Sequence, residues 1–344
     1  MEDAIKAQAH GLGFDLVGIT KLGAVETASH FRQWLDAGFA GAMSYLERHT
    51  AVRGDTRLPH HGMTSAIVVG LDYGGREPRG PVARYARGDD YHDLMWRRLD
   101  ELHDWIGGHV GRPVPGRGYV DTGPILERDL ARRAGLGWFG KNTNLINPKT
   151  GSFFFIGALL VDLDLVADTP FEADRCGTCT RCLDACPTDA FVEARKLDAT
   201  KCISYLTIEL RDSIPHHLRG GIGENLYGCD ICQDVCPWNV RFGSAVKEAA
   251  FRPRAVIGTT DARGLARELL EMNEETYRAA FRGSAMKRAK LRGLRRNAAV
   301  VLGNVGGPED FDVLSRASAD PDAMVAEHAA WALERIRSSR SSSG

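Results

Sequence analysis

Two compact apolar stretches stand out in the first half of the chain. Residues 65–73 read SAIVVGLDY and residues 152–165 read SFFFIGALLVDLDL. Short apolar runs rich in β-branched and aromatic residues are typical of buried strands. Between them, residues 90–109 carry apolar side chains at helical spacing, and residues 125–134 favour a short charged helix. Residues 1–170 are therefore predicted to form an α/β domain.

The last part of the chain shows a repeat with a period of 31 residues. Ala298 matches Ala329, Leu302 matches Leu333, and Gly and Pro residues that break helices lie between the two segments. This pattern predicts helix, turn, helix, turn, helix, similar to a small pair of HEAT-type repeats. A generic helical cap with chance similarity is the alternative. The serine-rich end, residues 338–344, is expected to be disordered.

Composition and charge place the chain among ordinary globular proteins. Its 344 residues are 43% hydrophobic and 26% charged, with a formal net charge of −1. Any contact with nucleic acid must therefore come from a local patch. The N-terminus has neither a basic start nor an apolar segment typical of export signals, and the apolar run Phe153–Val161 is too short to span a bilayer. We expect a cytoplasmic protein with no membrane segment.

Eight cysteines fall between residues 172 and 240, and in the cytoplasm such clustering indicates metal or redox chemistry. A CxxCxxCxxxCP run is followed by a lone cysteine and then by CxxCxxxCP; these cysteines are Cys176, Cys179, Cys182 and Cys186, then Cys202, then Cys229, Cys232 and Cys236. The first run is that of bacterial ferredoxins, in which three thiolates hold one 4Fe–4S cluster and the fourth holds its neighbour.

Crossed ligation then gives two sets of four thiolates with none left over. The predicted sets are Cys176, Cys179, Cys182 and Cys236 for one cluster, and Cys186, Cys202, Cys229 and Cys232 for the other. Zinc sites also use CxxC pairs. The triple run and the two Cys-Pro pairs favour two 4Fe–4S clusters, which carry electrons one at a time.

Two clusters need an electron acceptor, either another protein or a second cofactor bound by residues 1–170. Gly135-Leu-Gly-Trp-Phe-Gly140 matches a dinucleotide motif, but it follows a predicted helix where that motif follows a strand. We interpret it as a helix C-terminal turn. Asp90-Tyr-His92 resembles the start of the cobalamin motif DxHxxG, but Met95 stands at the glycine position. By itself, His92 is better interpreted as a residue at the start of a helix than as a metal ligand.

Several motifs together resemble the epoxyqueuosine reductase family, and the similarity runs from about residue 1 to about residue 333. The motifs are Gly118-Tyr-Val-Asp-Thr-Gly-Pro124, Leu126-Glu127, Gly135-x-Gly137-x-x-Gly140-Lys-Asn142, Ala86-x-Gly88-x-Asp90-Tyr-His92, Cys202-Ile-Ser-Tyr-Leu-Thr-Ile-Glu209 and Gly228-Cys-Asp-Ile-Cys-Gln-x-Val-Cys-Pro-Trp-Asn239. The resemblance implies a cobalamin and iron–sulfur enzyme related to the reductive dehalogenases. That family performs the last step of queuosine synthesis, converting epoxyqueuosine to queuosine at the wobble position of tRNAs for Asp, Asn, His and Tyr.

The resemblance also implies an α+β or α/β multidomain fold. Residues 1–170 would form a reductive-dehalogenase-like cobalamin-binding α/β domain and residues 171–245 a ferredoxin-like domain with two 4Fe–4S clusters. Residues 246–337 would form a HEAT-like helical domain that binds tRNA, followed by the disordered tail 338–344. The clusters would pass electrons singly to a base-off cobalamin that has no histidine beneath the cobalt, giving nucleophilic cob(I)alamin.

Residue roles follow from the same resemblance. Asp121 would be the acid that protonates the leaving oxygen, and the cobalamin contacts would be Arg53, Asp121, Lys141, Asn142, Ser152 and Ser204. An ordinary Asp has a pKa of ~3.9, so burial or an electron-rich neighbour would have to raise it. From the sequence alone, Asp121 before Thr-Gly-Pro is typical of a helix N-cap, and Arg53 and Lys141 could be solvated surface charges.

Residues 282–296 contain seven basic side chains and no acidic one: Arg282, Lys287, Arg288, Lys290, Arg292, Arg295 and Arg296. The stripe could be a solvated helix face. In a family with a tRNA substrate, we interpret it as a phosphate-binding surface. We expect a monomer that receives electrons from an external donor. The competing functions are a reductive dehalogenase of a small substrate and a ferredoxin-like electron carrier.

Overall fold

The computed structural model describes residues 1–59, 61–258 and 261–341. The strands are β1 (Leu16–Lys21), β2 (Ser65–Asp72), β3 (Gly116–Val120), β4 (Trp138–Phe139), β5 (Leu145–Ile146), β6 (Phe154–Val161), β7 (Phe191–Glu193) and β8 (Lys196–Leu197). The α-helices are α1 (Glu2–Gly11), α2 (Ala28–Asp36), α3 (Thr50–Arg53), α4 (Tyr91–Val110), α5 (Glu127–Arg133), α6 (Arg181–Asp184), α7 (His216–Ile222), α8 (Ile231–Asp234), α9 (Pro237–Phe242), α10 (Ala262–Glu271), α11 (Glu274–Ala280), α12 (Lys290–Val305), α13 (Phe311–Ser318) and α14 (Ala323–Ser341).

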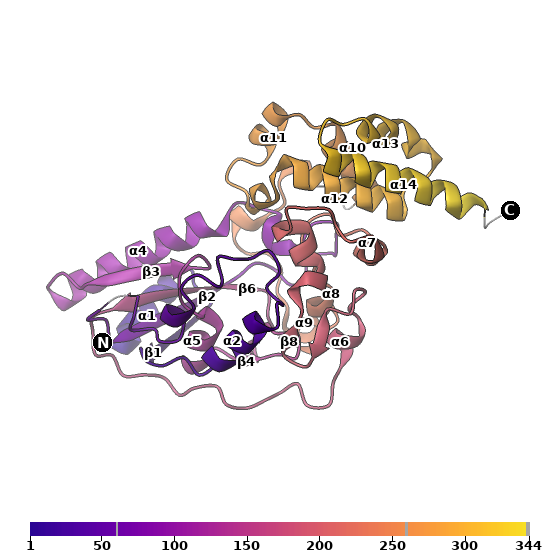
Figure 1. The fold of residues 1–344 in the computed structure, drawn as a ribbon. Helices are drawn as coiled ribbons and strands as arrows, with labels where there is room; N and C mark the ends of the chain where they lie inside the picture. Colours follow the sequence, from indigo (N-terminus) through magenta and orange to yellow (C-terminus); the bar gives the residue numbers. More distant parts are fainter. Residues whose placement is uncertain (60, 259–260, 342–344) are drawn as a thin grey trace.

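A four-stranded sheet of order β1-β2-β6-β3 forms the centre of the N-terminal half (Figure 1). All its neighbouring strands are antiparallel, and β2 pairs with β6 over eight residues, from Ser65 opposite Val161 to Asp72 opposite Phe154. Both strands were predicted as apolar runs, and the sheet places them at its centre, where every β2 residue is buried. The antiparallel order makes this half an α+β arrangement.

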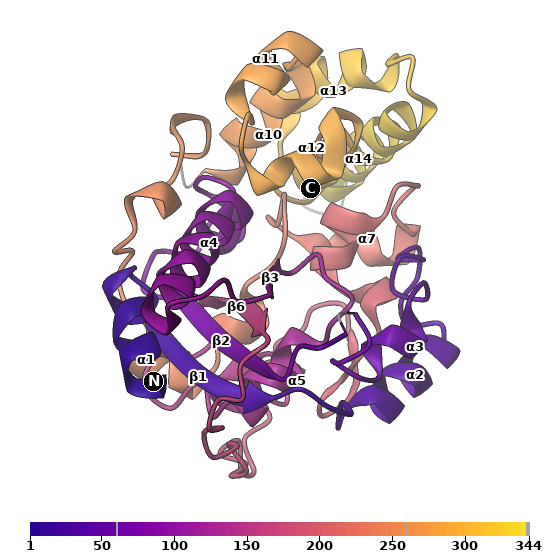
Figure 2. The same cartoon turned by 90° about the vertical axis from the view of Figure 1, so that its left-hand side faces the viewer.

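Alternate residues of β2 serve two different cores. Ile67 and Val69 face the side covered by α1 and α4, whereas Ala66 and Val68 face the side covered by α5. A strand buried on both faces reads as a continuous apolar run, which explains the sequence of β2. The helix predicted at residues 90–109 is α4. The loop that follows β3 leads from the edge of the sheet to α5 (Figure 2).

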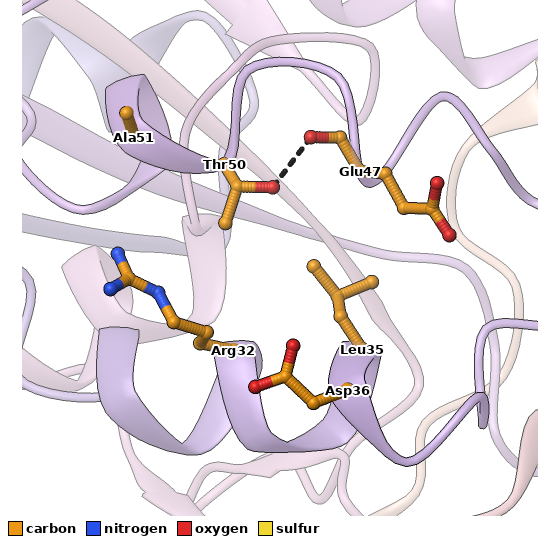
Figure 3. A pocket seen from close by; sticks show the side chains of 6 residues that line it. All are labelled: Arg32, Leu35, Asp36, Glu47, Thr50 and Ala51. Carbon is orange, nitrogen blue, oxygen red and sulfur yellow. Dashed lines mark hydrogen bonds between the residues drawn. The ribbon is translucent and has the colours of Figure 1, made fainter.

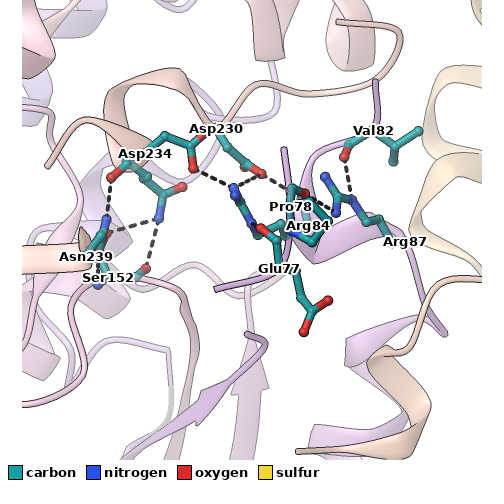
Figure 4. A network of polar contacts seen from close by, with 10 residues as sticks. Glu77, Pro78, Val82, Arg84, Arg87, Ser152, Asp230, Asp234 and Asn239 are labelled. Atoms are coloured by element: carbon teal, nitrogen blue, oxygen red, sulfur yellow. Dashed lines mark hydrogen bonds and ion pairs between the residues drawn. The ribbon is translucent and has the colours of Figure 1, made fainter. Parts of the chain in front are cut away.

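A buried polar network joins the sheet to the cysteine-bearing segment (Figure 4). The guanidinium of Arg84 donates to Asp230 Oδ2 at 2.9 Å and to Asp234 Oδ1 at 2.7 Å. Close by, the amide of Asn239 donates to the Ser152 hydroxyl at 3.0 Å. Buried charges need such partners, and here they hold α8 and its neighbouring cysteines in a fixed place against the sheet.

The C-terminal helices α10 to α14 group at one end of the molecule, beyond the sheet (Figures 1 and 2). Helices α12, α13 and α14 follow the predicted order helix, turn, helix, turn, helix. Ala298 and Ala329, which match across the 31-residue period, are both fully buried. Leu302 and Leu333 are also buried. A helical C-terminal part is therefore confirmed, whereas its kinship to HEAT repeats stays a prediction.

Two features differ from the prediction for the end of the chain. Residues 338–341 belong to α14, because the helix runs on to Ser341, so the prediction of disorder was wrong for them. Residues 342–344, the rest of the predicted disordered tail, lie outside the described residues. The hydrophobic core of α10 to α14 also includes Ile203, Leu206 and Leu226. This core thus crosses the predicted domain boundary between residues 245 and 246.

None of the helices in the described ranges is long and apolar enough to cross a membrane.

Candidate functional site

Asp121 lies in the loop that leaves β3, in a backbone conformation that few residues adopt. Its φ is +58°, in the left-handed region that Asp tolerates better than most residues. The loop packs tightly against the side chain of Tyr119. A Cβ atom on Gly123 would lie 2.2 Å from the Tyr119 ring, so only glycine fits at this position. Arg53 donates to the carbonyls of Gly123 at 3.1 Å and Ile125 at 3.2 Å. Arg53 therefore fixes the loop that presents Asp121.

His92 faces this loop from the first turn of α4. Asp90 caps the helix, since its carboxylate accepts from the His92 backbone N–H at 3.1 Å, and it also contacts His92 Nδ1 at 2.7 Å. The interpretation of His92 as a helix-start residue is confirmed. With Nδ1 held by Asp90, the other ring nitrogen Nε2 points at Asp121, with its atom 3.7 Å from Asp121 Oδ2.

His92 and Asp121 form an ion pair whose two pKa values move apart. The 3.7 Å separation is too long for a full hydrogen bond. Burial opposes protonation of His92, but its contacts with Asp121 and Asp90 outweigh this and raise its pKa to about 9. His92 in turn lowers the pKa of Asp121, against the opposing effect of desolvation. At neutral pH the proton of this pair therefore resides on His92.

These observations correct two expectations for Asp121. Helix α5 begins at Glu127 after Leu126, so Asp121 is not a helix N-cap. The pKa of Asp121 is lowered where a lone general acid would need it raised, because an imidazolium faces it. Asp121 and His92 therefore have to be considered as one unit that holds one proton. The one signal for His92 in the sequence is its place two residues after Asp90 in the broken cobalamin motif.

The eight thiols fall into two neighbouring sets on the segment that holds α6, α8 and α9. Burial and the neighbouring thiols Cys236, Cys176 and Cys179 raise the pKa of Cys182 to about 11. Burial raises the pKa of Cys229 to about 12, and the negative charge of the Cys202 thiolate adds to this effect. Most of these effects fall within the sets that crossed ligation predicts, because Cys176 and Cys179 act on Cys182 and Cys236, and Cys202 acts on Cys229 and Cys232. Cys182 also raises the pKa of Cys232, and the assignment of ligands to each cluster stays a prediction.

Hydrogen bonds to sulfur suit these thiols to cluster ligation. The Ala190 N–H donates to Cys186 Sγ at 3.4 Å, and the Trp138 indole donates to Cys176 Sγ at 3.4 Å. Such donors stabilise the thiolate form that iron–sulfur clusters require. In the described ranges, no three or more His, Cys, Asp or Glu side chains converge closely enough to hold a single metal ion. A cuboidal cluster is wider than one ion, so its thiolates stand further apart.

The predicted cobalamin contacts separate into two groups. Ser152 is buried and bonded to Asn239, and Asn142 is buried with its amide donating to the Cys232 carbonyl at 3.2 Å. Lys141 Nζ donates to the Gly177 carbonyl at 2.7 Å. These side chains join the sheet domain to the cysteine segment. Arg53, Asp121 and Ser204 are partly or largely accessible, and the cobalamin contacts as a set stay a prediction.

The structure splits the predicted basic stripe. Arg296 is only 1% exposed, and it donates to the carbonyls of Leu206, Leu210 and Asp212. Its assignment to tRNA binding was wrong, because a guanidinium enclosed by backbone carbonyls cannot reach a phosphate. Burial lowers the pKa of Arg296 to about 10. The remaining six residues of the stripe are at least partly exposed.

Ion pairs hold three of these six residues: Arg288 to Glu209, Arg292 to Asp322 and Arg295 to Asp320. Arg282, Lys287 and Lys290 are exposed, and none forms an ion pair with a residue that the structure describes.

Arg288 links the stripe to the loop of Asp121. Its guanidinium lies over the Tyr45 ring, 5.4 Å from the centroid. Burial and the charge of Glu209 raise the pKa of Tyr45, and Asp121 adds to this effect. Tyr45 therefore lies within electrostatic reach of both the basic stripe and the Asp121 loop.

An open surface hollow of about 410 Å³ lies between α2 and α3 (Figure 3). Its lining consists of Arg32, Leu35, Asp36, Glu47, Thr50 and Ala51. None of the residues predicted to act in the site lines it.

Comparisons with known proteins agree with this architecture. A family model described as 4Fe-4S double cluster binding domain matches residues 175–239, and one described as epoxyqueuosine reductase QueG matches residues 53–122. An epoxyqueuosine reductase from Pseudomonas aeruginosa is 40% identical over 97% of this chain and 94% of its own length. The Escherichia coli epoxyqueuosine reductase is 40% identical over 96% of this chain and 88% of its own length.

Solved structures give the same result for the fold. A crystal structure of an epoxyqueuosine reductase has a TM-score of 0.88 at 28% identity and covers 97% of this chain and 90% of its own. A second, with an epoxyqueuosine-modified tRNA-Tyr stem loop, has a TM-score of 0.88 at 28% identity, covering 97% of this chain and 89% of its own. The fold and the paired thiol sets define an iron–sulfur oxidoreductase. This chain belongs to the epoxyqueuosine reductase family.

Proposed function

We propose that this protein reduces epoxyqueuosine to queuosine at the wobble position of tRNA. Its relatives in Pseudomonas aeruginosa and Escherichia coli are epoxyqueuosine reductases at 40% identity over nearly the whole chain. The observation that carries the proposal is the His92–Asp121 ion pair, presented on the loop after β3 of the same chain that bears two sets of four thiols. We further propose that it acts in the cytoplasm as a monomer, with an external electron donor.

Two 4Fe–4S clusters and a base-off cobalamin are the cofactors we propose. The thiol sets would hold the clusters, and Arg53, Asp121 and Ser204 would lie toward the cobalamin. Buried polar atoms without a hydrogen-bond partner among the described residues gather at this loop, namely His92 Nε2, Arg53 Nε and Glu127 Oε1. Unsatisfied groups of this kind suit a site that is completed by a bound group. When bound, these cofactors would pass to the substrate the two electrons that the external donor supplies.

The protein's own groups supply protons. Reduction of an epoxide to an alkene takes two electrons and two protons and releases the oxygen as water. Asp121 is the group nearest to the leaving oxygen in this proposal, and His92 holds the proton that Asp121 passes on. The solved Bacillus subtilis epoxyqueuosine reductase, 27% identical with a TM-score of 0.84, is described with the loop of its catalytic aspartate swung out of the active site. That description supports a loop that moves around the substrate.

For the tRNA we propose a narrower surface than the seven-residue stripe. Arg282, Lys287 and Lys290 are the exposed cations free of ion pairs within the described part of the stripe, so phosphates can reach them without breaking an existing contact. The wobble base would have to leave its stack to reach Asp121, as base-modifying enzymes require. The HEAT-like character of α12 to α14 is part of this proposal.

The decisive experiment is turnover of tRNA that carries epoxyqueuosine, with a halogenated small molecule assayed in parallel. We expect Asp121→Asn to retain cobalamin and both clusters and to lose turnover, because the amide cannot transfer the proton. Asp100→Asn, on the exposed face of α4, is the control and should remain active. Full activity of Asp121→Asn would remove Asp121 from the mechanism. Dehalogenation without tRNA turnover, or no cobalamin absorbance after reconstitution, would refute the proposed function.

A further inference from the structure

Glu127 is a half-buried acid that directly follows the loop carrying Asp121. It is the first residue of α5, and its Oε1 atom is buried without a hydrogen-bond partner among the described residues. A buried carboxylate oxygen without a partner is costly, so such a group is retained when it has another use. Asp129, two residues further along α5, also has one buried oxygen without a hydrogen bond, Oδ1, but it lies 3.5 Å from Arg133 Nε, and its Oδ2 accepts from both the N–H and the hydroxyl of Thr27 at 3.0 Å.

The groups around Glu127 bring the pKa of its carboxyl close to neutral, so that the carboxyl can both take up and release a proton. Desolvation and the negative charge of Asp121 raise its pKa to about 7, against the cations Arg128 and Arg53, which lower it. Tyr91 also lies within electrostatic reach of Glu127. The backbone of Glu127 directly follows the loop that carries Asp121, and its buried Oε1 atom has no hydrogen-bond partner among the described residues.

The reaction needs more protons than the ion pair holds. Two protons are consumed for each epoxide, one when the first C–O bond breaks and one when the oxygen leaves as water. The His92–Asp121 pair holds a single proton. We propose that Glu127 holds the second proton of the reaction and delivers it through Asp121, an inference that rests on the proposed function.

Breaking of the first C–O bond takes the proton of the His92–Asp121 pair onto the oxygen. Breaking of the second C–O bond forms the alkene, and the departing oxygen takes the proton that Glu127 has supplied to Asp121. The two electrons come from the external donor, and solvent returns both protons afterwards. Glu127 acts through Asp121, so it is a positioning and proton-supplying residue and does not itself touch the substrate.

The test compares Glu127→Gln and Glu127→Asp with the wild type in the cofactor-loaded enzyme on epoxyqueuosine-containing tRNA. Because Glu127 must be protonated to act, wild-type kcat should fall as pH rises through about 7. Glu127→Gln should lower kcat at least tenfold, remove this pH step and leave KM within about twofold. Glu127→Asp should restore part of kcat together with a pH step. Glu26→Gln, a surface carboxylate paired with Arg132, is the matched control.

The outcomes separate this inference from the proposed function. If the wild type does not turn over the tRNA at all, the proposed function fails. If it does, and Glu127→Gln keeps both kcat and the pH step, the inference is wrong. A lower kcat with an unchanged pH step would point to a structural role and would also overturn it. Should Glu127→Gln fail to fold or to take up iron and cobalamin, the wild-type profile decides, since the absence of a step between pH 6 and 8 contradicts the inference.

Discussion

Replacing His92 with asparagine should remove a pH-dependent contribution to stability. Folding raises the pKa of His92 from 6.5 to about 9, which corresponds to about 3 kcal/mol of preference for the charged ring. Because the Asp121 side chain is 69% exposed, solvent screens the pair, and we expect about 1 kcal/mol in practice. A raised histidine pKa stabilises fully below pH 6.5, and this stabilisation is lost as pH rises through about 9.

The assay is thermal unfolding of the anaerobic, cluster-loaded protein between pH 5.5 and pH 10. The melting temperature of His92→Asn should lie a few degrees below that of the wild type at pH 6, and the gap should narrow as pH approaches 10. Loss of ring stacking on Tyr91, 4.1 Å between centroids, adds an offset that does not depend on pH. His103→Gln, on the same helix, is the control. The His103 ring contacts the uncharged Val114 carbonyl and not a carboxylate, so its replacement should not produce a gap in melting temperature that depends on pH in this way. A gap that stays constant or widens with pH would refute the ion-pair reasoning.

Three further outcomes are expected. Arg296→Met should lower the free energy of unfolding by at least about 3 kcal/mol, because buried carbonyls lose their donor; denaturant unfolding measures this, and a change near zero contradicts the burial argument. Cys202→Ala should lose about half of the iron in an iron assay after reconstitution, and a full complement would rule out Cys202 as a ligand. Replacing Arg282, Lys287 and Lys290 together with alanine should weaken stem-loop binding and reduce the salt slope by about 2 to 3; an unchanged slope in a binding titration would exclude this surface.

Local patterns predicted the elements that bury a continuous apolar face. The runs in β2 and β6 were recognisable because both strands lie at the centre of the sheet, and α4 was recognisable from its one-sided apolar spacing and its Asp90 cap. The spacing of the cysteines indicates two sets of four cluster ligands, and this assignment stays a prediction, because crossed ligation joins cysteines that lie far apart in the sequence. Sheet order and strand direction could not be predicted, since they depend on contacts between distant segments.

The functional residues that sequence reasoning misjudged all depend on distant partners. Arg296 resembles its basic neighbours in sequence, yet the carbonyls of residues 206–212 enclose it. Glu127 stood inside a recognised motif without a role, because only the fold buries its Oε1 atom without a hydrogen-bond partner among the described residues. Ser152 bonds to Asn239, a contact that its place in the sequence did not indicate, and its role at a cofactor stays a prediction. Charge and residue type indicate candidates, but burial decides what each can contact.

Arg296 also has a consequence for the order in which the molecule assembles. The backbone that it ties down, from Leu206 to Asp212, begins four residues after Cys202. The ribosome makes Cys202 almost a hundred residues before Arg296, so this cysteine emerges without the support that fixes its neighbourhood. We therefore expect the cluster that uses Cys202 to be completed late, after helix α12 has been synthesised and packed. We expect a chain cut before α10 to leave that cluster unprotected, so that the helical end would complete the redox centre in addition to the RNA surface proposed for it.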